Sequence, residues 1–566
     1  MTDRIRPGPS PVWSVADRYL ARLARTDATA AHAAGAPVRT ELPQAAPDDV
    51  DDRNDAASAA RTELAGTIPI DSADADLRAA LGERLDAEML LSDNGFTDRL
   101  LAPLATPVQA IRSIFDALPT ATESDWEWLI GELEAVPAAF DGYRRTLARA
   151  AERGDRAAAR QVRLVARQCR SWIGPDIDFF RRLAAGAPEP LARAATRAGD
   201  RATAGTAEFA RFLEHDLLPA SPIADGVGSD IYRATAGAFL GAEVDPIAVA
   251  EWGWRELDRI DAEIEKLASD IDPAGRQAAI TRLDDDPTRI LRSDADIVNW
   301  LTDSMATVGD AIDGVHVDLP AAARLPACRI SHTGSGVMYY AAPDPELTRP
   351  GTVWWATEPG QGVHTWREQT TVHHEGIPGH HLQISAALAA DSLHPWQRTM
   401  CHIHGYAEGW AHHAETWAAE IGLLDDPGDR LGMLLGQAWR AARIVIDSGL
   451  HLDLPIPTGR IPGADRWTPD VGLAFLRQVT GLGPQMAQFE INRYLGWPAQ
   501  ALAFRLGAAL FAEIRAAARS RAGYRDRDFH NDLFRRGPMG LGPLRERMLG
   551  QRPASSPAVD DAPNRL

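Results

Sequence analysis

Cysteine is scarce in this sequence. Only Cys169, Cys328 and Cys401 occur among 566 residues, and they are widely separated, with no C-x-x-C pair. Disulfide frameworks and thiolate metal sites need more cysteines at closer spacing. The sequence therefore indicates neither, and we interpret each cysteine as a small core residue.

Long apolar runs are also absent. No stretch approaches the roughly 20 uncharged apolar residues that span a bilayer. Residues 1–20 include basic residues but lack the continuous apolar segment and the small-residue cleavage site of a signal peptide. We therefore expect a cytoplasmic enzyme without a membrane partner.

Basic charge is in deficit. The chain has 59 basic and 79 acidic residues, a formal net charge of -20, which opposes binding to phosphate backbones and anionic lipid surfaces. We therefore expect no nucleic-acid partner. Apolar residues are plentiful at 45%, and a chain this long can bury the core of one two-lobed catalytic body or of two to four domains.

Helical periodicity dominates the chain. Residues 11–27 predict one amphipathic helix, and apolar residues recur at spacings of three and four from about 73 to 217. The segment from about 28 to 62 is rich in Ala, Asp and Pro, and we interpret it as a mobile acidic linker. The predicted parts are an N-terminal helix and acidic linker (1–62), an N-terminal helical lobe (63–217), a C-terminal region that carries the candidate chemistry (218–550) and a disordered tail (551–566).

The residue pattern changes from helical to β-prone between about 326 and 357. Short β-prone runs, CRISHTGSGVMYYAAP and GTVWWAT, are separated by Gly and Pro and predict a small sheet or hairpin. Helical periodicity then returns from 367 to about 520. The expected fold class is therefore mainly α, with a small sheet.

The segment TVHHEGIPGHHLQ (371–383) carries the first candidate for chemistry. A zinc hydrolase of the gluzincin type needs two close histidines, a distant glutamate and a carboxylate base beside one histidine. His374 and Glu375 supply the first ligand and the base. The usual H-E-x-x-H spacing is absent, because Pro378 stands four residues after His374.

The second ligand is His380 or His381. In a regular helix His380 lies about 240° around the axis from His374, whereas His381 is nearly in line but about 10 Å further along. Pro378 lacks an N–H and the flanking glycines weaken a helix, so we expect the segment to bulge or unwind locally. A two-residue bulge would bring His380 to the ligand position.

The third ligand is expected from AEGWAHHAETWAAE, which offers Glu408 and Glu415 seven residues apart on one helical face. One of the two can bind an ion while the other orients a ligating histidine through its second ring nitrogen. The residues alone do not decide which glutamate has which role.

Four motifs carry a family resemblance: HEGIPGHHLQ, YAEGWAHHAE, RAARIVIDSGLH and NRYLGWPAQALAFRLG. In this order they resemble the bacterial family called domain of unknown function 885, grouped with HExxH-type metallopeptidases, over roughly residues 326 to 545. The Glu-to-Glu spacing also resembles thimet oligopeptidase-like and carboxypeptidase Taq-like enzymes. The resemblance implies a two-lobed zincin-like fold whose catalytic domain is the 218–550 region.

By position, the same resemblance makes Glu408 a zinc ligand and Glu415 its support. It also favours His380 as the second ligand, with His381 in a supporting place. One departure is His412-His413, where the family usually has Leu-Tyr. We place both on the substrate side, with the alternative that Glu408 and His412 hold the metal differently or hold a second one.

A polar stripe follows the helix RAARIVIDSGLH, where Arg440, Arg443, Asp447 and His451 fall at helical spacings. An arginine could clamp a substrate carboxylate, and His451 held by Asp447 could stabilise an oxyanion. The alternative is a solvated stripe of ion pairs.

Four further residues are candidates on the substrate side. Tyr494 could donate to an oxyanion, with Arg493 beside it for substrate. Tyr339 and Tyr340 could form an edge strand that holds an extended peptide. The alternative for the aromatic residues is packing in the core.

The resulting hypothesis is a hydrolase that holds one Zn²⁺ per chain at His374, His380 and Glu408. Glu375 activates water against a small peptide or amide substrate in a cleft between two helical lobes. One alternative uses the same site on a non-peptide metabolite, by amide hydrolysis or elimination. The other is a non-catalytic binding protein that retains the fold. The sequence does not indicate an oligomeric state.

Overall fold

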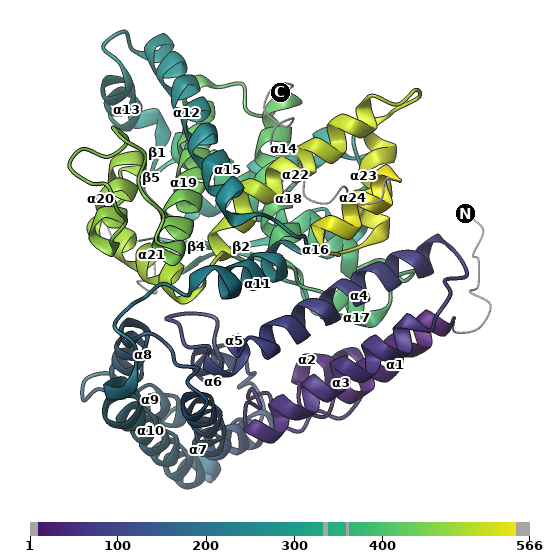
Figure 1. The fold of residues 1–566 in the computed structure, drawn as a ribbon, viewed down its shortest axis with the longest axis vertical. Helices are drawn as coiled ribbons and strands as arrows, with labels where there is room; N and C mark the ends of the chain where they lie inside the picture. The colour runs from purple at the N-terminus through teal and green to yellow at the C-terminus, as the bar shows by residue number, and fades with distance from the viewer. Residues whose placement is uncertain (1–9, 332–337, 358–361, 551–566) are drawn as a thin grey trace. The chain divides into compact units, whose positions relative to one another are not determined.

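The computed structural model describes residues 10–331, 338–357 and 362–550 (Figure 1). The chain forms two compact units. The first contains residues 1–68, 85–234 and 489–498, and the second contains residues 69–84, 235–488 and 499–566. Both are mainly helical, as predicted. The predicted boundary after residue 217 falls inside the first unit, and the predicted disordered tail lies outside the described residues.

The first unit is built from helices. They are α1 (Pro11–Leu23), α2 (Ala28–Ala33), α3 (Pro47–Ala65), α5 (Phe96–Arg99), α6 (Pro107–Ser113), α7 (Glu123–Glu152), α8 (Ala159–Trp172), α9 (Phe179–Ala184) and α10 (Ala192–Phe212). Its core forms where α7 and α10 lie side by side (Figure 1), with Phe140 and Phe209 stacked at 4.9 Å between ring centroids. Gly205 permits this approach, because a Cβ there would lie 2.8 Å from the Cα of Pro137.

The segment predicted to be a mobile acidic linker, 28–62, instead contains α2 and most of α3, joined by the irregular residues 34–46, so that prediction was wrong. Helix α3 begins with Pro47, and the Asp49 carboxylate accepts a hydrogen bond from the Ala46 N–H at 3.0 Å. Val50, Leu64 and three alanines form the buried face of α3, which packs against α1. The acidic residues lie mainly on the opposite face, so composition concealed a helix whose apolar face is made of small side chains.

The second unit contains most of the remaining helices and all five strands of the described residues. Its helices are α12 (Pro246–Ile271), α13 (Arg276–Asp284), α14 (Asp294–Ile312), α15 (Thr365–Glu375), α16 (His380–Leu388), α17 (Pro395–Thr399), α18 (His404–Glu420), α19 (Pro427–Leu452), α20 (Pro469–Thr480), α22 (Ala503–Arg519), α23 (Asp526–Arg536) and α24 (Leu541–Leu549). Helices α4 (Ser72–Asp93), α11 (Gly228–Leu240) and α21 (Pro484–Gly496) contribute residues to both units.

The predicted small sheet is present in the second unit. Strand β4 (Thr352–Ala356) lies between β2 (Ala327–Ser331), to which it is parallel, and β3 (Tyr339–Ala341), to which it is antiparallel. A separate antiparallel pair joins β1 (Ile290–Leu291) to β5 (Val363–His364). Val353 and Trp355 of β4 are buried against Leu301, Met305 and Val372, so the sheet packs onto α14 and α15.

Glycines set the distance between the helices that carry the candidate site. A Cβ on Gly432 of α19 would lie 2.2 Å from the backbone oxygen of Trp366 in α15. A Cβ on Gly409 of α18 would lie 2.7 Å from the Cα of Gly507 in α22. These contacts bring α15 against α19, and α18 against α22.

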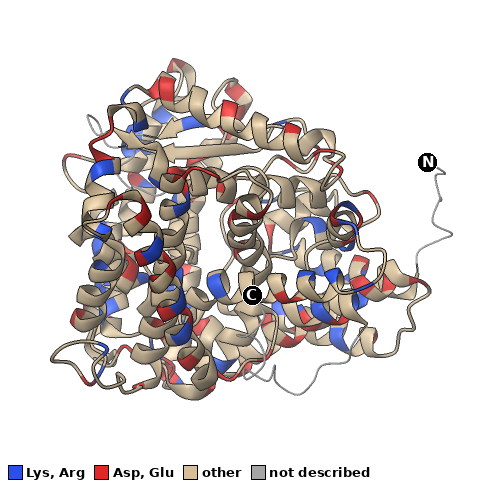
Figure 2. Cartoon of the chain, turned by 90° about the horizontal axis from the view of Figure 1, so that it is seen from above, with Lys and Arg blue, Asp and Glu red and all other residues tan. Residues whose placement is uncertain are grey.

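Charged residues of both signs are interspersed along the helices (Figure 2). Many form ion pairs within one unit, such as Arg181 with Asp200 at 2.7 Å and Arg170 with Glu214 at 2.6 Å. None of the described helices combines the length and the apolar character that crossing a membrane requires.

Candidate metal centre

The break between α15 and α16 shapes the candidate centre. Helix α15 ends at Glu375 and α16 begins at His380, so the predicted interruption at residues 376–379 is present. A Cβ on Gly379 would lie 2.1 Å from the His374 carbonyl oxygen and 2.4 Å from that of His373. Only glycine therefore lets the chain pass so close to the end of α15. His380 becomes the first residue of a new helix.

The break brings His374, His380 and Glu408 together. Glu408 Oε2 lies 3.3 Å from His374 Nε2 and 3.4 Å from His380 Nε2. One ligand atom from each of the three residues lies within 4.8 Å of the others. Zinc bonds of 2.0 to 2.1 Å in tetrahedral geometry separate ligand atoms by about 3.3 Å. The three residues therefore fit a zinc ion in donor type and in spacing.

The electrostatics of the cluster favour positive charge. Burial alone would raise the pKa of Glu408, but hydrogen bonds with His374 and His380 hold it well below its ordinary value. Burial would lower the pKa of His374, yet its hydrogen bonds with Glu408 and Glu415 raise it to about 10. The cluster thus stabilises a cation where a metal ion would lie.

Glu415 lies on the other side of the His374 ring. Its Oε1 is 2.8 Å from His374 Nδ1, and its Oε2 accepts a hydrogen bond of 2.6 Å from the Thr370 hydroxyl. Both contacts are buried. With Nδ1 held by Glu415, the Nε2 atom of His374 is directed at Glu408 and His380.

His412 belongs to the Glu415 side of the ring. Its Nδ1 lies 3.0 Å from Glu415 Oε1, and His374, His412 and Glu415 form a second group with metal-binding spacing. In the described residues no metal-binding group pairs His412 with Glu408. His412 and His413 are 0% and 3% exposed. Both side chains lie within the helix packing, and their predicted place on the substrate side stays a prediction.

Glu375 is half-buried at the last position of α15. Burial raises its pKa, and the charges of His380, His374 and Arg440 oppose the increase. The Glu375 side chain also keeps contact with solvent. A carboxylate with a raised pKa at the edge of a metal centre suits a general base.

The two arginines of α19 have different surroundings. Arg440 is half-buried, and its charge acts on both Glu375 and Glu368. Arg443 is buried, with its guanidinium 4.7 Å from the ring centroids of both Trp439 and Phe504. Arg440 is therefore the more accessible of the two arginines. The predicted substrate role of Arg443 does not fit its burial.

Asp447 and His451 are fully enclosed. Asp447 Oδ1 lies 3.7 Å from His451 Nε2, and its Oδ2 accepts a hydrogen bond of 2.9 Å from the backbone N–H of Ala499. Both side chains are 0% exposed. The pair is therefore not a solvated stripe, and its predicted role toward an oxyanion stays a prediction. It anchors the turn that precedes α22.

The two candidate tyrosines of β3 face opposite ways. The Tyr340 hydroxyl lies 2.9 Å from His381 Nδ1, and His381 is buried, so this contact ties the sheet to α16. Tyr339 is 48% exposed and stacks on Trp354. His381 thus lies outside the ligand cluster, and its predicted supporting role stays a prediction.

Arg493 and Tyr494 belong to the first unit, on α21. The Tyr494 hydroxyl donates to Glu490 at 2.8 Å, and Arg493 pairs with the same carboxylate at 3.3 Å. Tyr494 is 1% exposed. Their predicted roles toward substrate stay predictions.

Several residues of the centre were not found from the sequence. Thr370 could have been found, because it precedes His374 by one helical turn. Phe504, whose ring is parallel to His374 at 6.4 Å, comes from a distant helix. Trp410 donates through Nε1 to the Pro378 carbonyl at 2.9 Å and so supports the break. The pKa of His402 is lowered by the loss of hydration around its ring, and the nearby Glu408 charge opposes this decrease.

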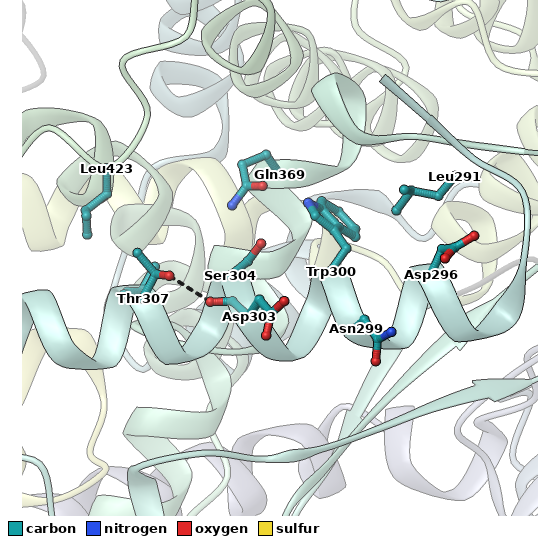
Figure 3. A pocket seen from close by; sticks show the side chains of 10 residues that line it. Leu291, Asp296, Asn299, Trp300, Asp303, Ser304, Thr307, Gln369 and Leu423 are labelled. Atoms are coloured by element: carbon teal, nitrogen blue, oxygen red, sulfur yellow. Dashed lines mark hydrogen bonds between the residues drawn. The ribbon is translucent and has the colours of Figure 1, made fainter. Parts of the chain in front are cut away.

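A separate pocket of about 550 Å³ lies along α14 (Figure 3). Figure 3 shows side chains of α14, among them Trp300 and Asp303, below Gln369 of α15. Gln369 precedes His374 by five residues, which places it about 140° around the helix axis. The pocket therefore opens on another face of α15 and shares none of the candidate ligands.

Comparisons with known proteins place the chain in a family. The family described as "Bacterial protein of unknown function (DUF885)" matches residues 29–548. No curated protein matches the chain. A structure titled "putative lipoprotein" from Colwellia psychrerythraea has a TM-score of 0.82 at 18% identity, covering 96% of this chain and 99% of its own.

A second solved structure is similar. It is titled "a putative lipoprotein of unknown function" and comes from Shewanella oneidensis, with a TM-score of 0.70 at 15% identity. The match covers 95% of this chain and 99% of that protein. At these identities the likeness establishes a shared fold.

Proposed function

Because this chain belongs to the bacterial family of unknown function DUF885, we propose a function from its own site: a zinc-dependent hydrolase that cleaves a peptide or other amide bond. The observation that carries the proposal is the convergence of His374, His380 and Glu408, with Glu408 Oε2 within 3.4 Å of both imidazoles. Two histidines and one glutamate are the ligand set of gluzincin hydrolases.

The ligand set leaves a position for water. Three protein ligands occupy three corners of a tetrahedron, and the fourth is open in catalytic zinc sites. Bound zinc would supply the Lewis acidity that polarises an amide carbonyl and activates the water. Glu415 and Thr370 hold the His374 ring, so the ligand geometry is fixed before substrate arrives.

Glu375 performs the proton transfers. Its carboxylate accepts a proton from the attacking water, and the water oxygen bonds to the amide carbon. As the C–N bond breaks, Glu375 returns the proton to the leaving nitrogen, which departs as an amine. The raised pKa of Glu375 supports this role, because a more basic carboxylate accepts the proton more readily.

Arg440 suits the recognition of a carboxylate on the substrate. Its charge lies near Glu375 on the half-buried side of α19. A planar guanidinium binds carboxylates through paired hydrogen bonds. A peptide with a free carboxyl terminus and a small metabolite with an amide and an acid group both satisfy this arrangement.

The experiment combines metal analysis with substrate profiling. The zinc-loaded protein is incubated with a library of short peptides and a set of N-acyl amino acids, and the products are identified by mass spectrometry. Glu375→Gln is the matched variant, which we expect to keep its zinc and to lose turnover by about a hundredfold or more. Wild-type protein that binds no zinc, or a Glu375→Gln variant as active as wild type, would contradict the proposal.

The compartment is also part of the proposal. The composition favours a cytoplasmic enzyme, whereas the structural neighbours are titled "putative lipoprotein". Fractionation of cells that express the untagged natural gene distinguishes a cytoplasmic enzyme from one anchored to a membrane.

A further inference from the structure

His412 is buried on α18 in direct contact with the residue that orients His374. Its Nδ1 lies 3.0 Å from Glu415 Oε1, the same oxygen that lies 2.8 Å from His374 Nδ1. The second oxygen of Glu415 accepts the hydrogen bond from Thr370 at 2.6 Å. One carboxylate oxygen is therefore shared by two imidazoles.

The protonation of the shared contact follows from its chemistry. The Thr370 hydroxyl donates to Oε2 of Glu415, and both imidazoles approach Oε1, so the carboxylate serves as an acceptor at each oxygen. An ionised carboxylate only accepts hydrogen bonds, so each imidazole nitrogen that faces Oε1 carries a proton. His412 thus donates through Nδ1.

The His412 ring makes no other hydrogen bond in the described structure. His412 is 0% exposed, and its Nε2 has no hydrogen-bond partner among the described residues. Burial lowers its pKa to about 4, so the ring is neutral at pH 7. A buried polar atom without a partner is unfavourable, because it has lost its hydrogen bonds to water. The single hydrogen bond to Glu415 is therefore the polar interaction that the ring makes.

Sharing weakens each of the two hydrogen bonds. A carboxylate that orients a ligating imidazole raises the basicity of that ligand and strengthens its bond to metal. A second donor on the same oxygen withdraws electron density and reduces this effect. The His412 hydrogen bond thus acts on His374 through Glu415, without contact between His412 and the ion.

We propose that His412 is a positioning residue that shares Glu415 Oε1 with His374 and thereby lowers the affinity of the centre for zinc. The inference rests on the proposed zinc site. In this inference His412 acts on the ligand His374 through Glu415. Removing the His412 donor is therefore expected to strengthen zinc binding.

The test compares two substitutions of similar bulk that differ in one donor. His412→Leu removes the N–H, whereas His412→Asn places an amide N–H near the position of Nδ1. Zinc affinity of the full chain is measured by competition with a chromophoric chelator, and circular dichroism verifies that both variants are folded. We expect His412→Leu to bind zinc about 3- to 10-fold more tightly than wild type, a smaller effect of opposite sign to the roughly 10- to 100-fold loss on removing a residue that bonds a metal ligand directly.

The asparagine variant tests whether the donor, and not the imidazole ring itself, sets the zinc affinity. We expect His412→Asn to bind zinc within about twofold of wild type, because the shared oxygen keeps its second donor. If the leucine variant binds zinc equally or more weakly, or if both variants change alike, the inference is overturned while the proposed zinc site stands. If wild type binds no zinc, the proposed function and this inference fail together.

Discussion

The backbones of Gly409 and Gly507 are in direct contact, and a Cβ on Gly409 would lie only 2.7 Å from the Gly507 Cα. This contact joins α18, which carries Glu408, to α22, which carries Phe504. Phe504 in turn lies parallel to the His374 ring at 6.4 Å. The spacing of the candidate centre therefore depends on two glycines that supply no ligand atom themselves.

Gly409→Ala is expected to destabilise the protein by about 1 to 3 kcal/mol, because the added methyl group must push the α22 backbone away. Thermal and urea unfolding measure the change. Gly131→Ala is the matched control. A Cβ at Gly131 meets nothing within 4 Å, so this helical substitution should stabilise the protein by up to about 1 kcal/mol. Equal effects at the two positions would contradict the packing argument.

The neighbouring histidines 380 and 381 are expected to behave oppositely. His380 Nε2 lies 3.4 Å from Glu408, whereas His381 Nδ1 faces the Tyr340 hydroxyl at 2.9 Å. His380→Ala should leave the purified protein with little zinc, and His381→Ala should keep it. Elemental analysis of both proteins decides the matter. A zinc-free His381→Ala protein beside a zinc-replete His380→Ala protein would refute the assignment.

The two glutamates of α18 are also expected to differ. Glu408→Ala should nearly abolish zinc binding, because it removes a ligand. Glu415→Ala should weaken affinity or activity by about 10- to 100-fold, because His374 keeps its Nε2 but loses its orientation. Zinc titration of the two variants measures both effects. If Glu415→Ala is the variant that empties the site, the two roles must be exchanged.

Acid is expected to destabilise the second unit through buried histidines. His530 is 0% exposed, and burial, opposed by its hydrogen bond with the His316 carbonyl, lowers its pKa to about 4. Between that value and the ordinary value of about 6.5, the unfolded chain binds a proton that the folded chain excludes, so stability falls as pH falls through this window. The effect of this one group is up to about 3 kcal/mol.

His530→Phe removes the titrating group and keeps an aromatic ring beside Trp417, which His530 approaches to 4.1 Å between centroids. Urea unfolding at several pH values between 4 and 7 should give a shallower dependence for this variant than for wild type. Parallel dependences for the two proteins would show that His530 does not titrate on unfolding.

Local chemistry in the sequence predicted much of the candidate centre. Pro378 between two glycines predicted a break in the helix. The break is present, because α15 ends at Glu375 and α16 begins at His380. The β-prone runs predicted the small sheet. The helix break and the small sheet depend on residues close together in sequence, so the local sequence pattern is sufficient to predict them.

The burial of several predicted site residues was not found from the sequence. Asp447, His451, His412 and His413 are polar residues on helices, and the sequence alone suggested contact with solvent or substrate. Their burial depends on partners far along the chain, such as the backbone N–H of Ala499 for Asp447. For α3 the sequence suggested too little burial. Its acidic composition indicated a solvated segment, but a row of alanines forms a buried face.

The division of one helix into α15 and α16 also has a genetic consequence. Two ligands on an unbroken helix keep their spacing by the regularity of the helix alone. Here the spacing depends on Gly379, where any side chain would meet the His374 carbonyl oxygen at 2.1 Å. A saturation screen for inactive alleles should therefore recover Gly379 as often as the ligand codons, although this residue donates no atom to an ion.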